Sequence, residues 1–302
     1  MAPDQQPADS GARPPVATCY RHPDRETGVR CTRCDKPVCP DCMVSAAVGF
    51  QCPDCVREAN RTFRPTRTEY GGRTSGDPAL VTKILIGLNL AVFLFGQIAG
   101  DGFYATFLMV GRAYYGGDSL VGLAEGPDQW YRLLTAAFLH QAIWHLAVNM
   151  MSLWFLGPYL ESLLGRTRFL GLYLLAALGG SAASFLFAPH PSTASLGASG
   201  AIFGLFGAIF VVHRSKGYDL RSLVVILAIN LVIGFLPGSA IDWRAHLGGL
   251  VTGALVAAGM VYAPRGPRRA LVQAGVCVVA LALVLGAVLL GTNLLASSPL
   301  GA

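Results

Sequence analysis

The chain has 302 residues, of which 53% are hydrophobic and 13% are charged, and its mean hydropathy is +0.50. This composition excludes a water-soluble globular protein with an ordinary charged surface and indicates a polytopic membrane protein. The net charge is +6, but the basic residues are concentrated in the connections between apolar stretches, which disfavours a nucleic-acid-binding protein.

The N-terminal part of the chain contains a dense set of metal-ligand pairs. Residues 1–17 are rich in Pro, Ala and Gln, and we predict that they are disordered. Seven of the eight cysteines and one histidine then follow as pairs separated by two residues: Cys19 and His22, Cys31 and Cys34, Cys39 and Cys42, Cys52 and Cys55. Such a gap lets both members of a pair bind one tetrahedral ion, so the four pairs predict two zinc ions.

A disulfide scaffold is the alternative interpretation of these cysteines. It fits badly with a cytoplasmic location and leaves an odd cysteine unpaired. Residues 18–58 are therefore predicted to form a module held by two structural zinc ions, since they contain too few apolar residues to fold without metal. We expect the module to bind a cytoplasmic protein partner or to regulate the rest of the chain, because the ligand pairs use every candidate catalytic side chain.

The spacing of the first three pairs resembles that of a B-box zinc finger. That family interleaves its ligands, which implies two groups: Cys19, His22, Cys39 and Cys42, and Cys31, Cys34, Cys52 and Cys55. The last pair departs from the family, in which histidines are usual at that place. Residues 59–78 follow as a juxtamembrane linker, and the stretch Arg61–Gly76 is predicted to be flexible and to touch anionic lipid.

Seven apolar stretches are predicted to cross about 30 Å of hydrocarbon as helices. They are Leu80–Ala99, Ile143–Leu160, Phe169–Phe187, Ser199–His213, Leu223–Leu236, Ala245–Tyr262 and Leu271–Leu295, and the fourth and fifth are short. Basic residues cluster before the first span and in every second connection: Arg61, Arg64, Arg67, Arg73 and Lys83; Arg166 and Arg168; Arg214, Lys216 and Arg221; Arg265, Arg268 and Arg269. By the positive-inside rule the N-terminus is expected in the cytoplasm and the C-terminus outside.

Two residues in separate spans indicate acyl-transfer chemistry. Ser199 lies in a Gly-Ala-Ser-Gly run between Gly197 and Gly200, and His246 lies near the start of the sixth span. A nucleophilic or ionisable group at membrane depth is costly and indicates function. A serine nucleophile and a histidine base on neighbouring helices suffice for a protease that works within the bilayer.

Polar residues at the start of the second span share the predicted depth of Ser199. His145 and Asn149 are four residues apart, hence on one helix face, and His140 precedes them. One alternative is that such residues only join helices by hydrogen bonds. The predicted function is an oxyanion site, in which His145, Asn149 and the backbone N–H of Ser199 donate to the developing negative oxygen.

Small residues are predicted to bring the fourth and sixth spans together. They form one smooth face on each helix, with Gly200, Gly204 and Gly207 on the fourth and Ala245, Gly249 and Gly253 on the sixth. Asp242 lies one turn before His246 and is expected to be a solvated carboxylate. Whether it also orients the His246 ring is left open.

Taken in order, these motifs resemble the rhomboid intramembrane serine proteases over roughly Leu80–Tyr262. The resemblance implies that Ser199 is the nucleophile, that His246 is the base, and that His145, Asn149 and the Ser199 amide form the oxyanion hole. It assigns supporting roles to four residues: His140, Gly197, Gly200 and Phe203. Phe203 stands where many bacterial members have a tyrosine stacked on the histidine. Trp130 and Arg132 look like the family's first-loop Trp-Arg pair with one residue inserted, and Glu161 and Gly165 like its Glu-x3-Gly.

The resemblance implies an all-α polytopic membrane protein with a six-helix rhomboid core at 79–262 and a seventh transmembrane helix and tail at 263–302. The expected substrates are transmembrane segments of other proteins, and the expected location is the plasma membrane of a bacterium. The alternative function is a catalytically silent rhomboid-like adaptor that binds transmembrane helices.

Overall fold

The computed structural model describes residues 16–62, 66–74, 76–115, 119–188, 190, 192–236 and 241–296. The chain divides into two compact units, Met1–Pro65 and Thr66–Ala302. The predicted disordered N-terminus, up to residue 15, and the tail beyond residue 296 lie outside the described residues.

The N-terminal unit contains little regular structure. Strand β1 (Thr18–Cys19) pairs with β2 (His22–Glu26), β3 (Val44–Ser45) pairs with β4 (Phe50–Gln51), and helix α1 (Pro53–Thr62) follows. Its buried cluster consists of Val38 and cysteines: Cys19, Cys31, Cys39, Cys42, Cys52 and Cys55. A core of this size cannot offset the entropy of ordering the segment without an additional constraint.

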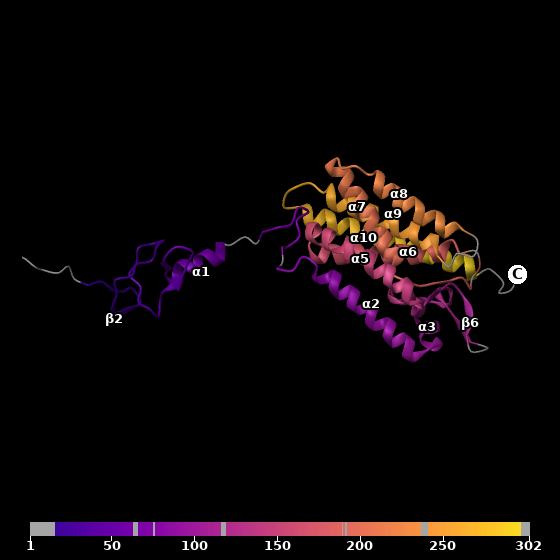
Figure 1. Cartoon of the computed structure of the whole chain (residues 1–302), viewed down its shortest axis with the longest axis horizontal. Helices are drawn as coiled ribbons and strands as arrows, with labels where there is room; N and C mark the ends of the chain where they lie inside the picture. Colours follow the sequence, from indigo (N-terminus) through magenta and orange to yellow (C-terminus); the bar gives the residue numbers. More distant parts are fainter. Residues whose placement is uncertain are drawn as a thin grey trace, which may run out of the picture. The chain divides into compact units, whose positions relative to one another are not determined.

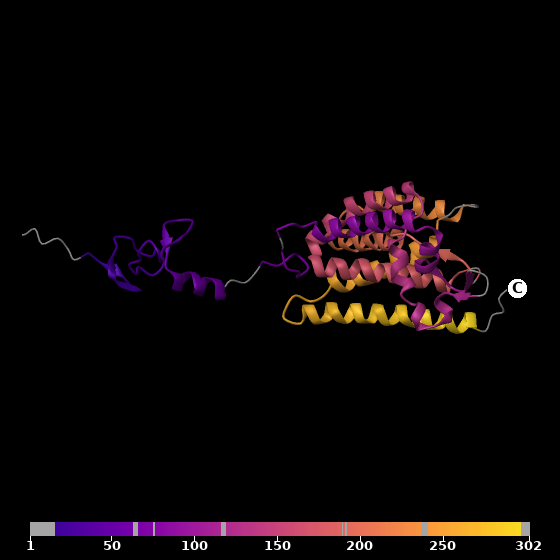
Figure 2. The ribbon, with the colours of Figure 1, turned by 90° about the horizontal axis from the view of Figure 1, so that it is seen from below.

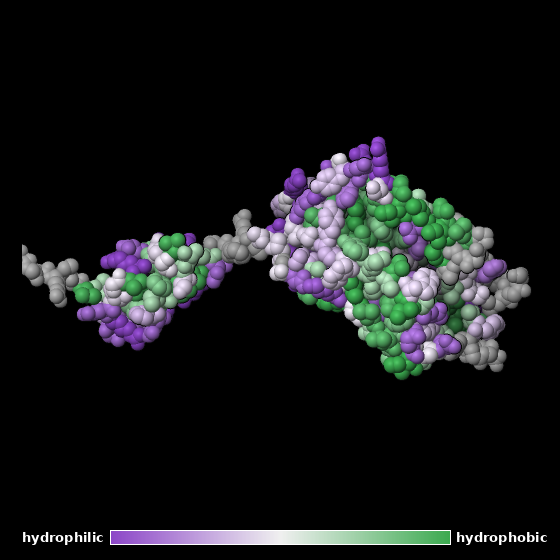
Figure 3. Space-filling view, in the orientation of Figure 1, coloured by the Kyte–Doolittle hydropathy of each residue, from purple (hydrophilic) through white to green (hydrophobic). Residues whose placement is uncertain are grey.

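The second unit is a bundle of long helices (Figure 1). A helix coincides with each predicted span to within a few residues: α2 (Leu80–Ala99), α5 (Ile143–Leu164), α6 (Arg166–Leu186), α7 (Ser199–Lys216), α8 (Arg221–Phe235), α9 (Trp243–Val261) and α10 (Arg269–Ala296). Of the described helices, α2, α6, α9 and α10 are long and apolar enough to cross a membrane, whereas α8 is apolar but shorter. Figure 3 shows apolar residues over the middle of the unit and hydrophilic residues toward its ends, as expected of a protein embedded in a bilayer.

Helices α6, α7 and α9 pack with their backbones in close contact. A Cβ atom added at Gly249 would collide with the backbone of Gly200, and one added at Gly253 would collide with that of Gly204. The close approach of α7 and α9 predicted from their small residues is therefore confirmed.

Helix α10 is an outer helix of the bundle and lies along one side of it (Figure 2). It packs against α9 where Gly259 accommodates Val276, and against α6 where Gly291 accommodates Phe185.

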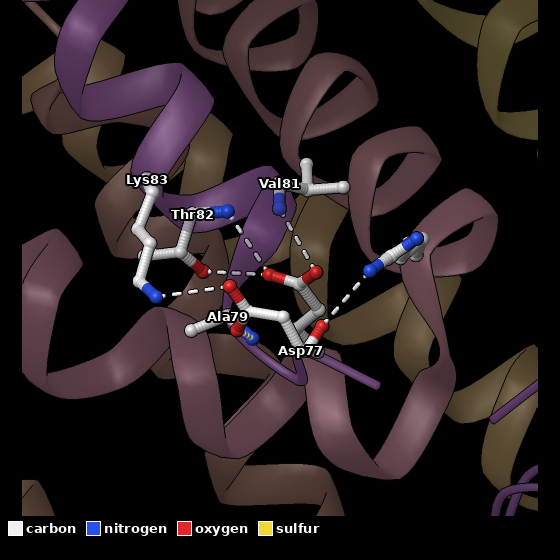
Figure 4. Close-up of polar contacts among 7 residues, drawn as sticks. Asp77, Ala79, Val81, Thr82 and Lys83 are labelled. Atoms are coloured by element: carbon white, nitrogen blue, oxygen red, sulfur yellow. Dashed lines mark hydrogen bonds and ion pairs between the residues drawn. The ribbon is translucent and has the colours of Figure 1, made fainter. Parts of the chain in front are cut away.

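Helices α2 and α5 are joined by a buried carboxylate. Glu161 near the end of α5 is 2% exposed and accepts hydrogen bonds of 2.9 Å from the backbone N–H groups of Val81 and Thr82 and from the Thr82 hydroxyl. Figure 4 shows these bonds beside the Asp77–Lys83 ion pair of 2.9 Å. Lys83, together with the backbone N–H of Ala79, lowers the pKa of Asp77. Since no side chain of α2 caps its own N-terminus, Glu161 satisfies its free N–H groups from another helix.

The prediction that Arg61–Gly76 is a flexible linker is wrong for Thr66–Thr74. These residues form a turn docked on the bundle. Tyr70 is 5% exposed and its backbone N–H donates to Leu163 O at 3.2 Å. Gln273 of α10 donates to the carbonyl oxygens of Tyr70 and Met260 at 3.0 and 2.9 Å. We call this end of the bundle the basal end; α2, α6 and α10 begin there, and α5, α7 and α9 end there.

The connection between α2 and α5 is folded. It contains α3 (Asp101–Phe107), β5 (Met109–Val110), β6 (Ala113–Tyr115), β7 (Ser119–Val121), α4 (Arg132–Thr135) and short 3-10 turns, among them Ala136–Phe138. Strand β5 pairs with β8 (Ala194–Ser195), which lies just before α7. None of these strands was predicted, and the β5–β8 pair ties this connection to the segment that leads into Ser199.

Candidate functional site

Ser199 is the first residue of α7 and is half-buried. The chain enters the helix through Gly197, whose φ of 120° favours glycine and whose N–H donates to Ala136 O at 2.8 Å. No side chain caps this helix start. The first N–H groups of α7, including that of Ser199, have no partner within the helix and can therefore donate to a ligand.

His140, His145 and Asn149 lie together beside Gly197. The Asn149 amide donates to Nε2 of His140 at 3.0 Å, and the rings of His140 and His145 are 5.0 Å apart in an edge-to-face arrangement. A Cβ atom at Gly197 would lie 2.7 Å from Cε1 of His145, so only glycine lets this ring lie so close to the start of α7. His140 and Asn149 are 0% and 4% exposed.

His246 of α9 stacks on Phe203 of α7. The ring centroids are 4.1 Å apart and the rings are inclined by 14°. His246 is 6% exposed, and its Nδ1 has no hydrogen-bond partner in the part of the chain that the structure describes. The orientation of the imidazole therefore depends on the stacked ring.

The residues next to Ser199 and His246 meet where α7 contacts α9. Gly200, next to Ser199, packs against the carbonyl oxygen of Ala245, next to His246, so a Cβ at Gly200 would lie 3.4 Å from it. Phe203 lies about one turn after Ser199 on the same helix, so the imidazole that it holds lies over this first turn.

Asp242 is not the solvated carboxylate that was expected. It is half-buried and caps α9, accepting from the backbone N–H groups of Arg244 and Ala245 at 3.1 and 3.3 Å. It also accepts a hydrogen bond from the hydroxyl of Ser184 on α6. An aspartate just before a helix is a common cap, so this signal was available in the sequence, whereas the Ser184 contact was not.

Arg132 anchors the connection between α2 and α5. It is 2% exposed and donates to the carbonyl oxygens of Ala105 and Leu108 at 2.8 and 3.0 Å and to Gln129 Oε1 at 2.8 Å. It thus positions the segment that carries β5, and β5 in turn pairs with the strand preceding Ser199.

The N-terminal unit gathers the eight predicted metal ligands into two groups. They are Cys19, His22, Cys39 and Cys42, and Cys31, Cys34, Cys52 and Cys55, with the ligand atoms of each group within 4.8 Å of one another. This is the interleaved grouping that the B-box resemblance implies.

The spacing within each group suits a tetrahedral ion. Zinc–sulfur and zinc–nitrogen bonds of about 2.3 and 2.0 Å place sulfur atoms about 3.8 Å apart and sulfur and nitrogen about 3.5 Å apart. Here Cys34 and Cys52 Sγ are 3.7 Å apart, and His22 Nδ1 is 3.4 Å from the Sγ atoms of both Cys39 and Cys42. The donor sets, three thiols with an imidazole and four thiols, are those of structural zinc sites.

Known proteins resemble part of this chain. The family model described as "Rhomboid domain" matches residues 127–263. Rhomboid protease GluP of Bacillus subtilis (strain 168) is 38% identical over 199 residues, covering 64% of this chain and 37% of GluP. Inactive RHOMBOID-like protein 8 of Arabidopsis thaliana is 36% identical over 146 residues, covering 46% of this chain and 40% of that protein.

YdcA of Bacillus subtilis (strain 168), whose name also describes it as a rhomboid protease, is 36% identical over 140 residues, covering 45% of this chain and 69% of YdcA. The chain spans less than half the length of GluP and of the RHOMBOID-like proteins that it matches. The matched region contains α5 to α9, and with them the histidines, Asn149 and Ser199. This integral membrane protein belongs to the rhomboid family.

Proposed function

We propose that the chain is an intramembrane serine endopeptidase that cleaves transmembrane segments of membrane proteins. The observation that carries the proposal is the stacking of His246 on Phe203, which lies about one turn after Ser199 on α7. A buried imidazole held by an aromatic ring, beside an accessible hydroxyl at a helix start, is suited to nucleophilic catalysis.

In this mechanism the Ser199 hydroxyl attacks the scissile carbonyl carbon while His246 takes its proton. The imidazolium then gives this proton to the leaving amine, which yields an acyl-enzyme. A water molecule, deprotonated by His246, releases the second product and restores the serine. No carboxylate is needed, because the stacked ring and the close packing of α7 and α9 orient the imidazole.

Asn149, His145 and the Ser199 amide are proposed to stabilise the oxyanion. The Asn149 amide has two N–H bonds, and since His140 accepts one of them, the other remains to donate. His140 is thus a positioning residue for Asn149, which explains why a fully buried imidazole lies just before α5.

Labelling with a fluorophosphonate tests the nucleophile. Wild-type protein in detergent should be labelled and Ser199→Ala should not, with Ser152→Ala on α5 as the matched control that keeps its labelling. Mass spectrometry of a cleaved single-span substrate should place the cut near the substrate end that lies at the depth of Ser199, at small or helix-destabilising residues. Full activity in Ser199→Ala, or cuts at the opposite end, would refute the serine mechanism.

For the N-terminal unit we propose two structural zinc ions and a regulatory role through a cytoplasmic protein partner. The ligand geometry described above supports the ions.

For the whole chain we propose that the basal end faces the cytoplasm, because the basic residues lie there. Reporters fused before Cys19 should then report the cytoplasm and reporters after Ala302 the exterior; the reverse result would refute this orientation.

The second candidate is a silent adaptor that binds transmembrane helices without cutting them. This candidate is retained because Inactive RHOMBOID-like protein 8 is 36% identical to the chain, close to the 38% of the protease GluP. An unlabelled wild-type protein that still retains a membrane substrate in pull-down would support the adaptor over the protease.

A further inference from the structure

Three arginines from three separate segments converge at the basal end of the bundle. They are Arg67 in the docked turn, Arg168 in the first turn of α6 and Arg269 at the start of α10. Gly71 lies among them: a Cβ atom there would be 3.5 Å from Cδ of Arg269 and 3.8 Å from Nη2 of Arg168, and Arg67 Nη1 donates to its carbonyl oxygen at 3.2 Å. We call these residues the Gly71 arginine cluster.

The described contacts of these guanidinium groups are with neutral partners, and one of them places Arg269 over the Tyr70 ring at 5.9 Å from its centroid. Besides the Arg67 bond, Arg168 Nε donates to Gln273 Oε1 at 2.7 Å and Arg269 Nη1 donates to the backbone oxygen of Glu69 at 3.1 Å. The nearby Glu69 carboxylate is bonded instead to Lys216 at 2.7 Å. Within the described residues, no ion pair offsets the charge of the cluster, and Nε of Arg269 is buried without a hydrogen-bond partner.

The local electrostatics make this arrangement costly without an anion. Helices α6 and α10 both begin here, and a cation in the first turn of a helix is unfavourable because the helix start carries a partial positive charge. No side chain caps the start of α6. Three arginines, two helix starts and a buried unpaired N–H all favour a bound anion with several acceptor oxygens.

We propose that the Gly71 arginine cluster binds the phosphate group of an anionic phospholipid. A phosphate matches the planar, forked donors of arginine, and the helices that start at the cluster are apolar enough to place it where a bilayer meets water. The bound lipid would then hold the docked turn against α6 and α10. This inference is independent of the proposed protease activity.

The competing explanation is that these arginines merely follow the general excess of positive charge at one membrane face. Arg265 and Arg268 distinguish the two explanations. Both residues lie in the connection between α9 and α10, just before Arg269. They are exposed and do not take part in the contacts around Gly71. If only overall charge matters, replacing them must have the same effect as replacing Arg168 and Arg269.

The test is native mass spectrometry of the full chain in a zwitterionic detergent, titrated with dioctanoyl phosphatidylglycerol, dioctanoyl phosphatidylcholine or inorganic phosphate. The wild type should bind phosphatidylglycerol in preference to phosphatidylcholine. Arg168→Gln/Arg269→Gln should weaken phosphatidylglycerol binding by about tenfold or more, since it removes two charge-assisted contacts, whereas Arg265→Gln/Arg268→Gln should change it less than twofold.

Arg67→Gln is a second variant that does not endanger the fold, because Arg67 is exposed and its described side-chain bond is with Gly71. It should weaken phosphatidylglycerol binding by about threefold or more relative to Arg265→Gln. Thermal unfolding without lipid checks that each variant is folded. Equal binding by Arg67→Gln and Arg265→Gln, no preference for phosphatidylglycerol, or equally tight binding of inorganic phosphate would each overturn the phospholipid site.

Discussion

At the scale of single residues, the proposed chemistry depends on a hydroxyl and an imidazole that act as one unit. Ser199→Ala and His246→Ala should each abolish cleavage of a single-span substrate, and the double variant should be no worse than either, because removal of one group already removes the reaction path. Asn149→Ala should be milder, with a loss of roughly 10²–10³ in rate for one oxyanion donor. Rates measured in liposomes check this order; additive losses would refute the coupled pair.

The stacking of Phe203 on His246 allows a second test at this scale. Phe203→Tyr should keep the stacked ring and most of the activity. Phe203→Leu should reduce kcat by roughly three- to tenfold, because an aromatic contact of about 0.5–1.5 kcal/mol that orients the base is lost. Fluorophosphonate labelling rates should fall in the same ratio. If both variants behave alike, the ring does not position the histidine.

At the scale of elements, the glycines between α7 and α9 decide how closely nucleophile and base approach. Gly249→Ala should lower stability by roughly 1–3 kcal/mol and reduce activity, because the new methyl group collides with the backbone of Gly200. Gly171→Ala on α6 is the matched control, since a Cβ there meets nothing within 4 Å. It should leave activity unchanged and raise stability by up to about 1 kcal/mol through helix propensity. Thermal unfolding and cleavage assays separate the two.

Asp242 caps α9, and we expect it to act mainly through this cap. Asp242→Ala should lower stability by about 0.5–2 kcal/mol, because it removes the cap on Arg244 and Ala245 and the bond to Ser184. Its effect on cleavage should be smaller than that of Asn149→Ala. Asp242→Asn retains an accepting oxygen and should recover most of the stability, measured as the thermal midpoint; no recovery would show that the charge, not the cap, is needed.

At the scale of the whole molecule, the two units should respond differently to loss of metal. A chelator should unfold a Met1–Pro65 fragment, seen by circular dichroism, because its core consists mainly of cysteines. A Thr66–Ala302 chain should keep its cleavage activity, whereas Leu80–Ala302 should melt at a lower temperature because it lacks the docked turn around Tyr70. Fragment protein that contains no zinc after expression with ample zinc would refute the metal prediction.

The proposed dyad could be found in the sequence because its signals are local. The Gly-Ala-Ser-Gly run, the small residues around His246 and the four-residue step from His145 to Asn149 are each visible within one or two helix turns. The bond between His140 and Asn149 was not visible, because it depends on how the chain bends between the 3-10 turn at Ala136–Phe138 and α5. Asp242 was misread as solvated because its partner Ser184 lies on another helix.

The sequence by itself determined the membrane character, the positions of the long helices and the pairing of the candidate metal ligands. These follow from composition, hydropathy and short spacings, which add up along the chain without reference to distant residues. The rhomboid family followed from the resemblance of its motifs, each of which is a short stretch of sequence. The tertiary structure alone decided that Glu161 caps α2, that β5 pairs with β8, that Thr66–Thr74 dock on the bundle, and that three arginines surround Gly71. Each of these contacts joins residues far apart in sequence, and no local periodicity encodes which distant groups will meet when the helices pack.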